Sequence, residues 1–101
     1  MYLFQILLPR ADNSGEPFPK QDFDRIKEDL ACRFDGVTAY LQAPAEGLWR
    51  QGEHSRDDDI VVFEVMTGKI DLQEWRNCRA ELERRFRQHQ VVIRYMLMEL
   101  V

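Results

Sequence analysis

Apolar residues are arranged along the chain in two patterns, short runs that predict strands and a helical spacing that predicts helices. Four short runs are rich in branched and aromatic residues and are bounded by turn-forming residues such as Pro9 and Gly68, which is typical of β-strands. These runs span residues 2–8, 37–42, 60–66 and 91–101. The run from Ile60 to Met66 gives the strongest strand signal, because it consists almost entirely of residues that favour strands.

Apolar residues recur at helical spacing between the first two runs. Phe23, Ile26, Leu30 and Phe34 follow the pattern i, i+3, i+7 and i+11, which places them on one face of a helix. We expect Gly36 to end this helix in a C-cap role.

A second helix is predicted between the third and fourth runs. Asp71 can cap its N-terminus, and Glu74 stands at the capping-box position. The apolar stripe of this helix contains Trp75, Cys78, Leu82 and Phe86. Its last turn is basic, and Glu81 and Glu83 can pair with the arginines four residues further on, Arg85 and Arg87.

The resulting order, strand, helix, strand, strand, helix, strand, is that of a single ferredoxin-like βαββαβ domain over residues 1–101. Right-handed crossovers place the first and third strands in the centre of a four-stranded antiparallel sheet. The fourth strand then lies beside the first and the second beside the third. Both helices are expected to cover one face of the sheet.

Alternation along each strand assigns its residues to the helix-covered face or to the opposite one. A slip by one residue would place Glu64 or Arg94 under the helices, so the register is well determined. The expected helix-facing residues are Phe4, Ile6, Leu8, Val37, Ala39, Leu41, Val61, Phe63, Val65, Val91, Ile93, Tyr95 and Leu97. The other face then carries Leu3, Leu7, Ile60, Val62, Met66, Val92, Met96, Met98 and Leu100 around Gln5, Tyr40, Gln42, Glu64 and Arg94.

This second face is too apolar to remain in water, because contiguous exposed patches beyond a few hundred Å² usually mark an interface. We therefore expect a homodimer through this face, a dimeric α/β barrel.

The polar residues on that face form the candidate site. Arg94, Gln5 and Glu64 are expected on three neighbouring strands, with Tyr40 and Gln42 on the fourth. Arg94 could hold an anionic group while Glu64 acts as a catalytic base. Alternatively, Arg94 and Glu64 form an ion pair that fixes the register of a dimer interface.

The segment 43–59 is long for a hairpin connection, so function can concentrate there. Trp49 is a candidate anchor for a ligand or partner, although it can also fold back on its own hairpin. The run Asp57-Asp58-Asp59 lacks the alternate ligand spacing of a calcium loop, and His54 has no companion ligand nearby. We therefore expect no metal and no cofactor.

The composition of the chain argues against several classes of partner and location. The chain has 101 residues, of which 45% are hydrophobic and 32% charged, with a net charge of −4, so a nucleic-acid partner is not expected. Neither a membrane-binding segment nor a secretory signal is expected. Cys32 and Cys78 fall in the two helical patterns, and we expect both to be reduced, packed thiols in a cytoplasmic protein.

Three short stretches carry a resemblance to a known group. Arg33-Phe34-Asp35-Gly36-Val37-Thr38, Gly47-Leu48-Trp49 and Arg85-Phe86-Arg87-Gln88 resemble a family of small, uncharacterised bacterial proteins with a ferredoxin-like α/β domain, a domain of unknown function. The resemblance implies the fold and a bacterial origin, and it assigns no activity and no functional residue.

Two functional classes follow from these observations. The first is a homodimeric interaction or small-ligand-binding module. The alternative is an enzyme of the dimeric α/β-barrel type that acts on a small polar or anionic organic substrate near Arg94, Glu64 and Tyr40. Fold alone does not choose between them.

Overall fold

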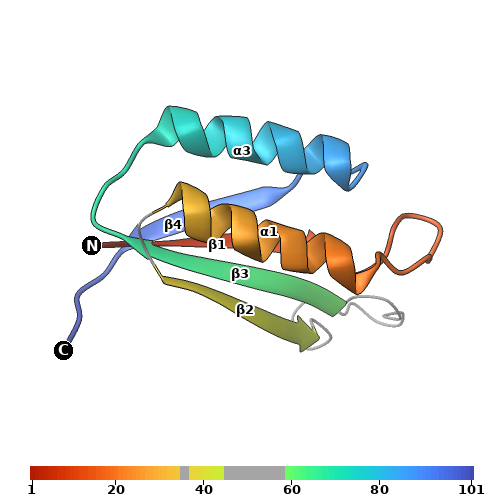
Figure 1. Cartoon of the computed structure of the whole chain (residues 1–101), viewed down its shortest axis with the longest axis horizontal. Coiled ribbons are helices and arrows are strands. Elements are labelled where there is room, and N and C mark those ends of the chain that lie inside the picture. The colour runs from red at the N-terminus through yellow and green to blue at the C-terminus, as the bar shows by residue number, and fades with distance from the viewer. Residues whose placement is uncertain (35–36, 45–58) are drawn as a thin grey trace, which may run out of the picture.

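The computed structural model describes residues 1–34, 37–44 and 59–101, and for residues 37–44 and Asp59 it describes only the backbone. The protein is α+β, with two helices and an antiparallel sheet, as the sequence predicts. The elements are β1 (Tyr2–Pro9), α1 (Lys20–Arg33), β2 (Val37–Pro44), β3 (Asp59–Thr67), α3 (Leu72–Arg85) and β4 (Val92–Leu97). Figure 1 shows α1 and α3 lying side by side over the same face of the sheet.

Strand β1 lies between β3 and β4 and pairs antiparallel with both, in the sheet order β2-β3-β1-β4. This order comes from the two helical crossovers, each of which skips one strand position: α1 leads from β1 to β2 past β3, and α3 leads from β3 to β4 past β1 (Figure 1). As a result, a residue on β1 has a neighbour on each side: Gln5 lies opposite Glu64 on β3 and opposite Arg94 on β4.

The core lies between the sheet and the two helices. Alternate residues of the central strands are at most 1% exposed: Phe4, Ile6, Leu8, Val61, Phe63 and Val65. The predicted helix-facing positions of β1 and β3 are therefore confirmed. The ring of Trp75 on α3 stacks on Phe4 and on Phe34, with centroids 4.1 Å apart in each pair, and thereby joins the sheet to the ends of both helices.

Strand β4 differs from the sequence prediction in length and in burial. It ends at Leu97 rather than at Val101, because β1 begins at Tyr2 and the last backbone bond on this side joins the Met98 amide to the Met1 carbonyl. Tyr95 lies opposite Phe4 and so belongs to the predicted face, yet it is 44% exposed, and Leu97 is 71% exposed. The prediction that both would be covered by the helices is wrong, since β4 is an edge strand.

The register of β2 also differs from the prediction. The backbone pairs Tyr40 with Phe63 and Gln42 with Val61, whereas the sequence assigned Tyr40 and Gln42 to the face of Glu64. Residues directly opposite on neighbouring strands share a face, so the predicted parity of β2 is inverted. The reason is that both sheet faces are apolar, and alternation along β2 then does not indicate which set faces the helices.

The helix ends follow local chemistry. Asp71 caps α3 as predicted, and its carboxylate accepts a hydrogen bond from the Glu74 amide at 3.2 Å. Helix α1 ends at Arg33, with Phe34 as its C-cap in an extended conformation. The predicted capping residue Gly36 lies outside the described residues.

Ion pairs along the helices connect α1 to α3. Arg85 contacts Asp29 at 3.5 Å and Glu81 at 3.7 Å, the latter being a predicted pair. Glu83 instead pairs with Arg79 at 3.9 Å, and its carboxylate accepts the Val91 amide at 3.0 Å. The predicted contact between Glu83 and Arg87 is not made, because Arg87 lies beyond the helix with φ 51° and turns toward the loop after β1.

Candidate functional site

Three polar side chains form a row across the sheet face that the helices leave uncovered. The Gln5 amide Nε2 donates a hydrogen bond to Glu64 Oε2 at 2.8 Å, and Arg94 Nε donates one to Gln5 Oε1 at 2.8 Å. The row Glu64–Gln5–Arg94, called the polar row below, thus runs perpendicular to the strands from an anionic end on β3 to a cationic end on β4. The sequence predicted this convergence correctly.

In the polar row, Glu64 and Arg94 are joined through Gln5 rather than by the direct ion pair considered above. Strands β3 and β4 lie on opposite sides of β1, and adjacent strands are about 4.8 Å apart, so Glu64 and Arg94 start from backbones about 10 Å apart. Gln5 joins the two charged groups by using both ends of its amide. Because an amide has a donor end and an acceptor end, the two charges fix its orientation.

Apolar residues surround the polar row on the same face, called the open face below. On the side toward the C-terminus of β1, Leu7 lies opposite Val62 and Val92; on the other side, Leu3 lies opposite Met66 and Met96. These side chains are half-buried or exposed, and Val92 and Met96 are each 45% exposed. In the described part of the chain, neither helix lies over this face (Figure 1). The open face is therefore an apolar surface with one polar strip through its middle.

The remaining predicted site residues are not joined to the polar row by the described contacts. Tyr40 and Gln42 are described by backbone alone, and their register pairs them with Phe63 and Val61 rather than with Glu64. Trp49 lies outside the described residues.

The hollows that are lined by described residues lie elsewhere, and none of them includes a member of the polar row. A groove of about 210 Å³ runs between α3 and the exposed strand β4. Its lining residues are Phe4, Leu72, Trp75, Arg76, Arg79, Ile93 and Tyr95. A second hollow of about 150 Å³ lies beside Arg33 and Trp75, where α1 ends and α3 begins. The first groove combines aromatic rings with two arginines, and sequence reasoning missed it because it depends on how α3 sits above the sheet edge.

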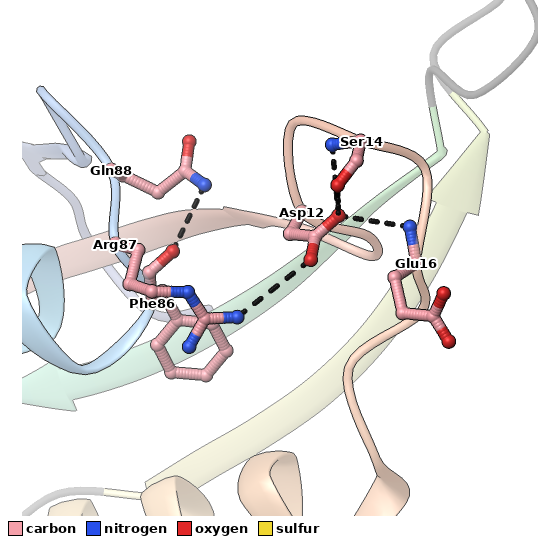
Figure 2. A network of polar contacts seen from close by, with 6 residues as sticks. All are labelled: Asp12, Ser14, Glu16, Phe86, Arg87 and Gln88. Atoms are coloured by element: carbon pink, nitrogen blue, oxygen red, sulfur yellow. Dashed lines mark hydrogen bonds and ion pairs between the residues drawn. The ribbon is translucent and has the colours of Figure 1, made fainter.

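The loop between β1 and α1 contains a second polar network (Figure 2). Asp12 Oδ1 accepts hydrogen bonds from the Ser14 and Glu16 amides at 2.9 Å, and Oδ2 lies 3.8 Å from the Arg87 guanidinium. The hydrogen bond from the Glu16 amide, followed by those from Ser14, lowers the pKa of Asp12 below its usual value near 3.8. Gly15 has φ 90°, which suits glycine in this tight turn. Since Asp12 joins its own loop to the segment after α3, we interpret the network as structural.

The two cysteines have different surroundings. Cys78 is buried in the core, and burial raises the pKa of its thiol. Cys32 is exposed on α1, so the prediction that both thiols are packed is wrong for Cys32. The buried face of α1 is formed by Phe23, Ile26 and Leu30. Cys32 lies on the solvent-exposed side of the same helix.

The described residues also bear on metal binding and on membrane insertion. Within residues 1–34, 60–101 and the backbone of 37–44, no cluster of three or more His, Cys, Asp or Glu side chains is arranged to hold a metal ion. None of the helices in the same ranges has the length and apolar character needed to cross a membrane.

Comparison with protein-family models, with curated proteins and with solved structures found no significant match. The resemblance to a bacterial ferredoxin-like family therefore stays a prediction.

Proposed function

We propose that this protein is a homodimeric interaction module built on a ferredoxin-like fold, in which two copies pack through their open faces as a dimeric α/β barrel. The single observation that carries the proposal is the open face itself. Half-buried and exposed apolar residues occupy the positions on both sides of the polar row, over the three strands β3, β1 and β4. Removing such a surface from water is favourable by about 25 cal/mol per Å² of apolar area.

A second copy is the occupant that the face favours, because the polar strip carries one anionic and one cationic end. When such a face packs on a copy of itself, the anionic end of each copy can pair with the cationic end of the other. The isologous interface of a two-fold dimer requires this kind of self-complementarity. An ordinary lipid or hydrocarbon ligand would instead leave Glu64 and Arg94 buried without new partners, which is costly.

The mass of the protein in solution tests the proposal. Analytical ultracentrifugation or native mass spectrometry at micromolar concentration is expected to give twice the chain mass of 12.1 kDa. Only monomer under these conditions would overturn it.

A charge placed on the open face is expected to dissociate the dimer. Met96→Lys changes an exposed residue of β4 and should leave the fold intact by circular dichroism while shifting the protein to monomer. Ile70→Lys is the matched control, because Ile70 is 39% exposed in the segment before α3 and does not belong to the open face. If Met96→Lys associates as tightly as Ile70→Lys, the dimer forms through another surface.

Binding of a small anionic ligand is a second candidate function, supported by the groove beside β4. Arg76 and Arg79 flank this groove, and the exposed ring of Tyr95 supplies an aromatic wall, a combination suited to a flat organic anion. A thermal-shift screen of aromatic carboxylates tests it: binding should raise the melting temperature of the native protein but not that of an Arg76→Gln/Arg79→Gln variant. No shift with any compound would contradict this candidate. The enzymatic alternative, with Glu64 as base and Arg94 as anion holder, stays a prediction.

A further inference from the structure

The polar row gives the open face a direction. At the level of Gln5, the groups that follow one another across the sheet are the carboxylate of Glu64, the amide of Gln5 and the guanidinium of Arg94. This order arises because Glu64 and Arg94 lie on opposite sides of β1. The levels above and below are apolar on both sides: Val62, Leu7 and Val92 at one level, and Met66, Leu3 and Met96 at the other. Over the three strands β3, β1 and β4, the charged ends of the polar row therefore distinguish the β3 side of this face from the β4 side.

Two copies packed face to face can be related by a two-fold axis in one of two limiting directions. An axis that runs along β1 exchanges the two sides of the sheet, so Glu64 lies opposite the partner subunit's Arg94. An axis that runs across the strands keeps the sides, so Glu64 lies opposite the partner subunit's Glu64 and the two arginines also meet. Over β3, β1 and β4 the apolar levels meet other apolar levels in both cases, so among the residues of these three strands the polar row decides between the two arrangements.

Opposite charges across an interface favour association, whereas like charges held together on an interface cost several kcal/mol. On the premise of the proposed dimer, we infer that the two-fold axis runs along β1, above Gln5. The two copies of β1 then point in the same direction, and each Glu64 pairs with the partner subunit's Arg94. Packed sheets commonly cross at about 30°. Because the polar row lies at the axis, such a rotation leaves each Glu64 nearest to the opposite charge.

A charge swap tests the axis directly. In a variant carrying both Glu64→Arg and Arg94→Glu, the amide of Gln5 can turn over and bridge the two charged groups as before, so the fold within each chain is preserved. With the axis along β1, the swapped chain pairs with itself as the wild type does. A mixed dimer would place two arginines together and two glutamates together.

The experiment mixes wild type and the swapped variant after each has been dissociated, and counts dimer species by native mass spectrometry. The swap leaves the mass unchanged, so the wild type is labelled with ¹⁵N. We expect mixed dimers to be depleted below the binomial share, roughly tenfold for two lost pairs of about 0.7 kcal/mol each. The depletion should shrink in high salt, because salt screens the charges.

The outcomes separate this inference from the proposed dimer. Mixed dimers at or above the binomial share overturn the axis along β1 while leaving the homodimer in place, since an axis across the strands would favour mixed pairs. Monomers in every sample, wild type included, overturn both. If the swapped chain does not fold by circular dichroism, Glu64→Lys with Arg94→Asp repeats the same test with different side chains.

Discussion

Gln5 Oε1 accepts a hydrogen bond from Arg94 Nε at 2.8 Å, across the pair formed by β1 and β4. The other end of the same amide donates to Glu64, so both ends of the amide are satisfied by charged partners. Hydrogen bonds to charged groups stabilise more than those between neutral groups. An open-face residue thereby connects all three strands at one level of the sheet.

Replacing Gln5 with methionine is expected to lower the free energy of unfolding by about 1 kcal/mol, because two charge-assisted hydrogen bonds are lost at a half-exposed position. Methionine keeps the length and nearly the volume of the side chain. Urea denaturation at several protein concentrations measures the effect and separates it from any contribution of association.

Gln73→Met is the matched control for this change. Gln73 makes one exposed hydrogen bond, from Nε2 to Asn77 Oδ1 at 3.1 Å, within a single helix. Its loss should cost less than about 0.5 kcal/mol. Equal effects of the two substitutions would show that the polar row adds nothing to stability.

The faces of the central strands could be predicted from the sequence because a shifted register would have a large cost in free energy. A one-residue shift of β1 or β3 would bury Gln5 or Glu64 under the helices, so alternation alone assigns both faces there. Strand β2 has no comparable charged residue between Val37 and Gln42, and its predicted parity is inverted. The ion pair between Asp12 and Arg87 was missed for a different reason: the two residues lie 75 positions apart in the chain.

The cap of α3 gives a second prediction. Asp71→Ala removes the side-chain acceptor for the Glu74 amide and is expected to lower the free energy of unfolding by about 1 kcal/mol. Asp71→Asn and Asp71→Ser keep an oxygen that can accept this bond, and they should retain most of the stability. Chemical denaturation of the three variants measures the difference. Equal loss in all three would mean that the charge, rather than the capping bond, stabilises this end of the helix.

The two thiols should react at very different rates with a thiol reagent such as Ellman's reagent at pH 8. Cys32 is exposed and is expected to react quickly, whereas Cys78 should react only when the protein unfolds, because it is buried and its pKa is raised. Native protein should therefore release one equivalent of dye rapidly and a second after addition of denaturant. Cys32→Ser is expected to abolish the rapid phase alone. A rapid phase that persists in this variant would contradict the described packing around Cys78.

The lowered pKa of Asp12 predicts a loss of stability in acid. Its carboxylate is stabilised in the folded state, so this contribution is fully present above the ordinary pKa near 3.8 and is lost as the pH falls through the lower folded value. Asp12→Asn keeps an oxygen for the loop amides but removes the charge, so the melting temperatures of wild type and variant should differ at pH 7 and converge below about pH 4. Arg87→Gln is the control: the backbone hydrogen bond from Glu16 is the largest cause of the shift and Arg87 the smallest, so the acid dependence should change little. A difference between wild type and Asp12→Asn that is as large at pH 3 as at pH 7 would show that the loop depends on the shape of residue 12 rather than on its charge.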